Sequence, residues 1–142
     1  MSTIQFFYQK PLKSLRNRVK LKEFLLKSAI SGKRRIDQLS IIFCGDAYLL
    51  EINKQYLQHD YYTDIITFDL SDKKGPINAE IYISIDRVKD NAKNLGTSFN
   101  QELHRVVFHG LLHLLGHKDK SLRDQKAMRQ AEEKLLSKYF HR

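Results

Sequence analysis

Short apolar and aromatic stretches of the chain predict four β-strands, and apolar and polar residues alternate in the last of them. Two of them, Ile4 to Tyr8 and Ile36 to Phe43, precede the middle of the sequence. The other two, Asp64 to Leu70 and Ile77 to Ile85, flank a cluster of turn-forming residues that ends in Gly-Pro. We expect these strands to form one small mixed sheet.

Apolar residues at helical spacing predict five helices around that sheet. Each helix begins near a residue that can cap an N-terminus, and three of them end near a glycine. The expected starts are Ser14, Asp46, Asp86, Ser98 and Ser121. Val19 in the first helix and Leu122 in the last are expected to face the core. The predicted fold class is α+β, a four-stranded mixed sheet with about five helices in a single domain of residues 1–142.

The most distinctive stretch is His109-Gly-Leu-Leu-His113-Leu-Leu-Gly116, in which two histidines lie four residues apart. Both imidazoles then project from one face of a helix and can reach a single metal ion. The leucines hold this helix against a core, and Gly116 can end it because glycine accepts the left-handed conformation. The spacing predicts a metal site at the end of this C-terminal helix.

The third metal ligand has two candidates. On an uninterrupted helix His117 would lie roughly 12 Å along the axis from His109, so the chain must first turn back. In extended zinc motifs the third ligand follows the glycine by three residues, which here is Asp119. His117 follows the turn directly and is the better zinc ligand by type. The spacing favours Asp119 and leaves His117 open.

Other interpretations of the motif are weaker. Two histidines on an apolar helix are often ordinary core residues, but the glycine stop and the carboxylate after it favour a metal site. Gly110 occupies the position at which metalloproteases of the His-Glu-x-x-His type carry their glutamate base, so proteolysis is disfavoured. His104 precedes His109 by five residues, points away from the metal face and is expected to be structural.

The motif and three upstream segments resemble the YbeY-type endoribonucleases, which mature ribosomal RNA in bacteria. Asn53-Lys-Gln-Tyr56 and Thr63-Asp-Ile-Ile-Thr-Phe68 are similar to the family's Asn-x-x-aromatic and Thr-Asp-Val-Leu-Ser-Phe segments. Ala79-Glu-Ile-Tyr-Ile-Ser84 matches its Gly-Asp-Ile-x-Ile strand in pattern. The resemblance implies a single-strand-specific endoribonuclease with one Zn²⁺ per chain, acting in small-subunit ribosomal RNA processing and ribosome quality control.

Two positions depart from the family pattern. The family's third ligand is usually histidine where this chain has Asp119, and many members have an arginine where this chain has Leu57. His59, in the loop before the third strand, is a candidate to replace that cation or to donate a proton. Asp64 is a candidate for orienting water or a ligand histidine. Structural roles remain open for both candidates.

The net charge of the 142-residue chain is +9, and the excess lies wholly in the N-terminal quarter. Residues 1–35 contain ten Lys or Arg and one acidic residue, whereas the remainder contains 15 of each. Such a field attracts polyanions, RNA above all. The alternative is a solvated helix face that only keeps the protein soluble. Together with the metal motif this charge favours RNA as the partner, and the resemblance implies that the RNA is a ribosomal RNA precursor on the small subunit. We expect the protein to be a monomer.

The single cysteine, Cys44, excludes an internal disulfide and fits a reducing compartment. No secretory segment follows Met1, and no apolar run approaches the ~20 residues of a membrane span. We therefore expect a cytoplasmic protein without a membrane partner. The main hypothesis is a zinc-dependent RNA phosphodiesterase. The alternative is a non-catalytic RNA-binding ribosome-assembly factor with a structural zinc.

Overall fold

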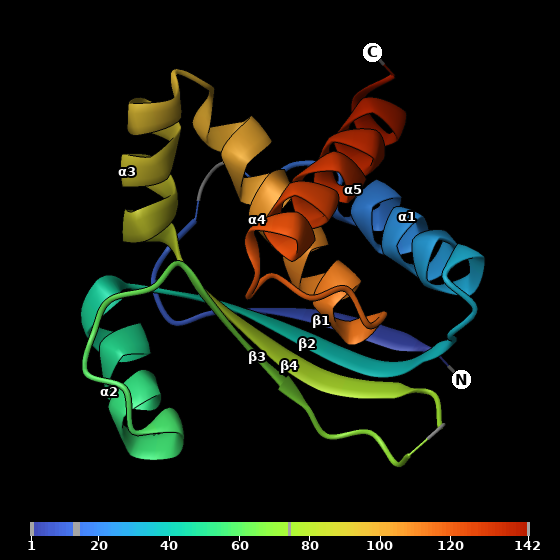
Figure 1. The fold of residues 1–142 in the computed structure, drawn as a ribbon, viewed down its shortest axis with the longest axis horizontal. Helices are drawn as coiled ribbons and strands as arrows, with labels where there is room; N and C mark the ends of the chain where they lie inside the picture. Colours follow the sequence, from blue (N-terminus) through green and yellow to red (C-terminus); the bar gives the residue numbers. More distant parts are fainter. Residues whose placement is uncertain (1, 13–14, 74, 142) are drawn as a thin grey trace.

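The computed structural model describes residues 2–12, 15–73 and 75–141 and is built around a mixed β-sheet (Figure 1). The sheet has four strands in the order β1-β2-β4-β3. β1 runs parallel to β2 and β2 parallel to β4, whereas β3 is antiparallel to β4. The strands are β1 (Thr3–Tyr8), β2 (Ile36–Cys44), β3 (Ile65–Asp69) and β4 (Ile77–Ser84). The predicted four-stranded mixed sheet is confirmed.

The part of the chain that the structure describes contains five helices, as expected. They are α1 (Arg18–Ser31), α2 (Asp46–Leu57), α3 (Ile85–Leu95), α4 (Phe99–Leu114) and α5 (Leu122–Phe140). α1, α4 and α5 lie on one side of the sheet and α2 on the other, while α3 stands beside α4 (Figure 1). None of the described helices combines the length and the apolar content needed to cross a bilayer.

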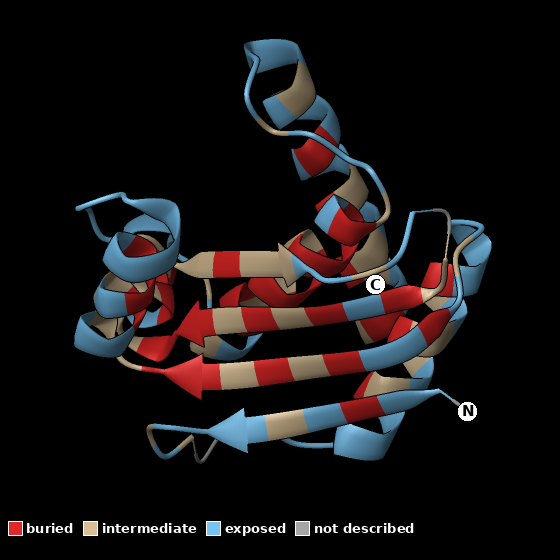
Figure 2. Ribbon diagram, turned by 90° about the horizontal axis from the view of Figure 1, so that it is seen from below, coloured by how far each residue is buried: buried red, intermediate tan, exposed pale blue. Residues whose placement is uncertain are grey.

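Each face of the sheet carries an apolar layer, because successive side chains of a strand point to opposite faces. Ile81 and Ile83 of β4 pack with Leu111 of α4 in the larger layer. Tyr82, between them in sequence, packs with Leu49 of α2 in the smaller layer on the other face. Figure 2 shows this alternation as buried bands along β2 and β4. The larger layer fixes α4 on the strands and so positions the predicted metal motif.

α4 packs closely against the sheet at Gly110. A Cβ atom added there would lie 2.8 Å from Cδ1 of Ile81 and 3.0 Å from Cδ1 of Ile65. Position 110 therefore faces the apolar layer between helix and sheet. A glutamate in this position would have to enter that layer, which is a physical reason against the protease hypothesis.

The structure differs from the expected course of α1. The helix begins at Arg18, after Asn17 in the left-handed conformation with φ 54°, and the expected start Ser14 lies outside the described residues. The prediction that Val19 faces the core is wrong, since its side chain is 70% exposed. The buried residues of α1 are Leu21, Leu25 and Ala29, which lie four residues apart on one face of the helix. Val19 precedes Leu21 by two residues and therefore points to the opposite side.

Two further predictions about the helices are wrong, namely that Asp46 caps α2 and that Leu122 faces the core. Gly45, not Asp46, is the N-cap of α2, and Asp46 is the first helical residue. Leu122 is 85% exposed because it begins α5 ahead of the turns that reach the core.

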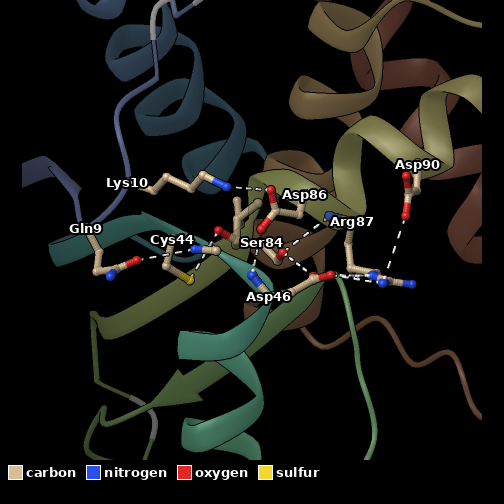
Figure 3. Close-up of polar contacts among 10 residues, drawn as sticks. Gln9, Lys10, Cys44, Asp46, Ser84, Asp86, Arg87 and Asp90 are labelled. Atoms are coloured by element: carbon tan, nitrogen blue, oxygen red, sulfur yellow. Dashed lines mark hydrogen bonds and ion pairs between the residues drawn. The ribbon is translucent and has the colours of Figure 1, made fainter.

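A network of ion pairs joins the ends of β2 and β4 to the helices that follow them (Figure 3). Asp46 accepts hydrogen bonds from Arg87 at 2.9 Å and from the Ser84 hydroxyl at 2.6 Å. Asp86 accepts from Lys10 Nζ at 2.7 Å and from the backbone N–H of Asp46 at 2.9 Å. The pKa of Asp46 is lowered mainly by Arg87 and that of Asp86 mainly by Lys10. The carboxylate of Asp46 thus links α2 to α3 instead of capping its own helix.

Candidate metal centre

α4 ends in a hydrogen-bonded turn that sends the chain back along the helix. Gly116 has φ 99°, and its N–H donates to the carbonyl of His113 at 3.1 Å. The N–H of His117 donates to the carbonyl of Leu112 at 3.0 Å. This pair of bonds is the Schellman motif, which requires a left-handed residue at the glycine position. The prediction that Gly116 ends the helix is confirmed.

Beyond this turn Asp119 returns to the first histidine of the motif. Its Oδ2 lies 3.3 Å from Nε2 of His109. Two donor atoms that are each about 2.0–2.1 Å from a tetrahedral zinc ion are about 3.3 Å apart. The contact is an ion pair when His109 is protonated, and its separation also fits two ligands of one zinc ion. His117, the alternative candidate, has an exposed side chain.

Both histidines of the motif direct Nδ1 to an oxygen atom. Nδ1 of His109 donates to Oε2 of Glu132 at 2.6 Å, and Nδ1 of His113 donates to the carbonyl of His117 at 3.0 Å. With the hydrogen on Nδ1, the neutral imidazole offers its lone pair at Nε2. Metal-ligating histidines are commonly held in this way by a carboxylate or a carbonyl. The donor chemistry of the two histidines fits a divalent metal.

The three predicted ligands do not all meet in the structure. Among the described residues, no group of three or more His, Cys, Asp or Glu side chains is arranged to hold a metal ion. The His113 ring is exposed, and its centroid lies 5.9 Å from that of His109. An exposed side chain changes rotamer readily, without displacing the core. The structure thus pairs His109 with Asp119 and leaves His113 beside them.

A buried cluster of charges, which the sequence analysis missed, supports His109. Oε1 of Glu132 accepts from Nη1 of Arg105 at 2.9 Å. Arg105 also donates two hydrogen bonds to Glu102, at 2.7 and 2.6 Å. The two glutamates are only 2% and 1% exposed. Burial would raise the pKa of Glu132, but the contacts with His109 and Arg105 lower it.

The charges of this cluster favour a cation on His109. Glu102 and Glu132 carry two negative charges against the one positive charge of Arg105. Burial lowers the pKa of His109, but the hydrogen bond and the charge of Glu132 outweigh burial and raise it. The carboxylates around His109 therefore favour a positive charge on the imidazole, carried by a proton or by a metal ion.

Asp64, one of the two predicted catalytic residues, lies at the edge of this cluster. Its Oδ2 accepts from Nδ2 of Asn91 at 3.1 Å and is 3.8 Å from Nη2 of Arg105. Burial raises the pKa of Asp64, and the charge of Arg105 opposes that effect. These contacts connect Asp64 to the guanidinium that holds Glu132, and its catalytic role stays a prediction.

His59, the other predicted catalytic residue, shares a cavity of about 230 Å³ with His113. Nδ1 of His59 is 2.9 Å from the Tyr61 hydroxyl, and the two rings stack with centroids 5.1 Å apart. Leu57, at the position of the family arginine, lines the same cavity. The loop therefore lies beside the part of α4 that carries His113.

A second cavity, of about 320 Å³, is lined by His109 and Asp119 together with Arg105 and Arg129. The side chain of Arg129 is half exposed, and its Nη1 lies 3.7 Å from Oε1 of Glu132. Guanidinium groups recognise phosphate oxygens through paired hydrogen bonds. This cavity can hold a phosphate group next to the side chains of His109 and Asp119.

Comparison with known proteins confirms the resemblance. The chain matches the sequence model of the family described as Endoribonuclease YbeY over residues 5–140. A Cytophaga hutchinsonii protein named Endoribonuclease YbeY is 50% identical over 135 residues, which cover 95% of this chain and 94% of the relative. A Bacteroides thetaiotaomicron protein of the same name is 44% identical over 115 residues, covering 81% and 83% of the two chains. A solution structure from Thermotoga maritima is similar with a TM-score of 0.62 at 26% identity, covering 98% of this chain and 90% of the other.

Proposed function

The chain belongs to the endoribonuclease YbeY family, and we propose that it is a zinc-dependent, single-strand-specific endoribonuclease of ribosomal RNA maturation. Family membership supports hydrolysis of RNA phosphodiester bonds. We further propose that residues 1–142 act as one domain, as a monomer in the cytoplasm. The substrate is the ribosomal RNA precursor of the small subunit, and the enzyme also serves ribosome quality control.

The setting of His109 is the observation that carries the metal proposal. Glu132 occupies Nδ1 at 2.6 Å, and Asp119 lies 3.3 Å from Nε2, the separation of two ligands on one zinc ion. We assign one Zn²⁺ per chain to His109, His113 and Asp119. When bound, such an ion lowers the pKa of a water molecule toward ~7 and polarises a phosphoryl oxygen.

The side chains around this position bind and orient the RNA. Arg129 holds a phosphate oxygen in the cavity that it shares with His109 and Asp119. His59 gives a proton to the leaving oxygen from the loop beside His113, and Tyr61 orients its ring through the 2.9 Å contact.

Asp64 acts as a positioning residue in this proposal. It lies 3.8 Å from Arg105, which in turn holds the carboxylate that orients His109. Its negative charge keeps the guanidinium directed toward the cluster.

The alternative function is an RNA-binding assembly factor with a structural zinc. The observation in its favour is that Glu132 of α5 already binds His109 of α4, so that a metal on His109 would strengthen the link between these helices. The two functions differ in whether the metal supports cleavage.

Metal analysis and a cleavage assay test the proposal together. Protein isolated without chelator is expected to carry about one zinc per chain and to cleave single-stranded RNA. His109→Ala, His113→Ala and Asp119→Ala should each lose the metal and the cleavage, because each removes one donor. His117→Ala is the matched control and should retain both. Zinc is measured by elemental analysis, and cleavage by electrophoresis of labelled RNA.

Three outcomes would change the assignment. Retention of zinc by Asp119→Ala with its loss from His117→Ala would make His117 the third ligand. A wild-type protein without divalent metal, which takes up none on dialysis against zinc, would contradict the metal proposal. One zinc per chain without cleavage of any single-stranded RNA would favour the assembly factor.

A further inference from the structure

A cavity of about 570 Å³ lies between α1, α4 and α5, away from the candidate metal centre. Figure 1 shows α1 and α5 on the same side of the sheet, and Lys20 of α1 donates to the carbonyl of Tyr139 of α5 at 3.1 Å. His104 lines the cavity five positions before His109, about 140° away around α4. This cavity shares no lining residue with the cavity at His109.

The charged residues that line this cavity are cationic. Arg16 and Lys20 are both exposed, and no carboxylate is among the described lining residues. Nζ of Lys20 lies 4.5 Å from the centroid of the Tyr139 ring in addition to its hydrogen bond with the carbonyl. Lys20 is therefore held at the cavity, where its charge can meet an anion such as a phosphate.

His104 contributes a buried hydrogen-bond acceptor without a partner. Its Nδ1 donates to the carbonyl of Asn100 at 2.7 Å, and the residue is 2% exposed. Burial is the main cause that lowers its pKa, against the hydrogen bond with Asn100, and Lys20 lowers it further, which favours the neutral ring. Nε2 then accepts hydrogen bonds, yet no described atom donates to it. A buried acceptor in this state favours a ligand that carries an N–H or O–H group.

The remaining residues that line the cavity could bind a ligand with a flat, polar ring. Phe140 is half-buried and lies at 86° to the ring of Tyr139. Asn17 and Asn100 add amide groups that both donate and accept hydrogen bonds. The side chain of Asn17 does not cap α1, although it directly precedes the helix. Cations, amides and an aromatic ring around one cavity match the phosphate and the base of a nucleotide.

We propose that this cavity binds one nucleotide of single-stranded RNA, at a contact separate from the cleavage site. The proposal rests on the proposed function, which makes RNA the substrate. The phosphate lies against Arg16 and Lys20, and the base packs on Phe140. A small movement of the surrounding aromatic rings gives the nucleotide access to the buried Nε2 of His104, which then accepts from a base N–H or a ribose hydroxyl. Only an unpaired base can enter, and a volume of about 570 Å³ falls within the range of small-ligand sites.

Two kinds of variant test the contact. Binding of 5′-AMP and of a short labelled single-stranded RNA is measured with chelator present, so that no cleavage interferes, and at high salt to screen general electrostatics. Arg16→Ala should weaken binding at least about 5-fold. Lys93→Ala, an equal change of charge at an exposed residue of α3 outside the cavity, should weaken it less than about 2-fold.

His104→Phe is the second variant, because it keeps an aromatic ring at this position. Phenylalanine also has the same charge as a neutral histidine. It should weaken binding of both probes about 5- to 10-fold through loss of the acceptor. Thermal unfolding verifies that the variant is folded. In wild-type protein, 5′-AMP should shift the side-chain amide NMR signals of Asn17 and Asn100.

Wild-type affinity in both Arg16→Ala and His104→Phe would overturn the inference. So would inorganic phosphate that produces the same amide shifts as 5′-AMP and displaces the RNA, because the cavity would then be an anion site only. Cleavage by the zinc-loaded wild-type protein separates this inference from the proposed function. Binding of 5′-AMP in the cavity of a protein that cleaves no RNA would support the nucleotide site and remove the nuclease assignment.

Discussion

At the scale of single residues, Glu132 determines how His109 is presented. A carboxylate that accepts from Nδ1 fixes the tautomer of an imidazole and also its orientation. Because Glu132 uses its second oxygen to bind Arg105, it cannot turn away without breaking a buried ion pair. His109 is thus held with Nε2 toward Asp119 by contacts that lie inside the protein.

Replacing this carboxylate should affect both metal binding and stability. Glu132→Gln is expected to lower zinc affinity about 10- to 100-fold, because the amide is a poorer acceptor for Nδ1–H. It should also reduce the free energy of unfolding by about 2–4 kcal/mol, since Arg105 loses a buried charged partner. Zinc titration calorimetry and denaturant unfolding measure the two effects.

The control for this variant is Glu51→Gln, the same chemical change at an exposed residue of α2. Its free energy of unfolding should differ from wild type by less than about 0.5 kcal/mol. An unchanged zinc affinity in Glu132→Gln would show that this carboxylate only stabilises the fold.

The spacing of the motif predicts His109 and Asp119, and the structure places their side chains in contact. It does not predict Glu132, which comes from another helix 23 residues later. A signal for it exists, because Met128 and Leu136 lie four residues to either side on the buried face of α5. An acidic residue between two buried apolar positions indicates a buried partner, but its identity depends on how α4 and α5 pack.

At the scale of elements, two helices end at glycines in the left-handed conformation. Gly96 after α3 has φ 67°, and Gly116 after α4 has φ 99°. A Cβ atom added to either would meet no other atom within 4 Å. A side chain at either position would therefore destabilise the protein through backbone strain at positive φ and not through a clash. Only the turn at Gly116 leads to the candidate metal centre.

This difference makes the two glycines a matched pair for mutation. Gly116→Ala and Gly96→Ala should each lower the free energy of unfolding by about 1–2 kcal/mol, because L-residues are strained at positive φ. Only Gly116→Ala should also weaken zinc binding, since Asp119 follows that turn. Denaturant unfolding and zinc titration measure both. Equal zinc affinity in the two variants would mean that the turn after α4 does not position a ligand.

The sequence predicts the start of a helix correctly where the helix has a capping residue next to it. Ser98 and Ser121 accept from backbone N–H groups three residues later, both at 3.0 Å, as their capping sequences predict. The start of α1 has no such signal. Leu15 is buried ahead of the helix and Asn17 is left-handed, so tertiary packing determines where α1 begins.

At the scale of the whole molecule, some basic residues of the N-terminal quarter bind other parts of the protein, and others are exposed to solvent. Arg34 donates to the last helical carbonyl of α4, that of Leu114, at 2.6 Å, and pairs with Asp69 at 3.3 Å. Lys27 and Lys33 are exposed, so their charges are available to a polyanion. The charge count of the sequence therefore overstates the part of this segment that can meet RNA.

The exposed part can be tested through the salt dependence of RNA binding. Each neutralised phosphate adds about −0.7 to the slope of log affinity against log salt for single strands. Replacing both Lys27 and Lys33 by Gln should flatten this slope by about 1.4, as measured by fluorescence anisotropy. The control replaces Lys89 and Lys93, which are exposed on α3, and should leave the slope unchanged. Equal slopes in all three proteins would mean that Lys27 and Lys33 do not bind RNA and only keep this face of the protein soluble.

The position of Glu132 in the chain also bears on when the site forms during protein synthesis. His109 leaves the ribosome 23 residues before the carboxylate that holds it. At about 5–20 residues per second, that interval lasts about one to five seconds, and α5 must then fold and dock onto α4. A nascent chain therefore displays the histidine motif before the oriented imidazole exists. Translation order thus delays the assembly of the candidate metal centre until synthesis has passed the helix that supports it.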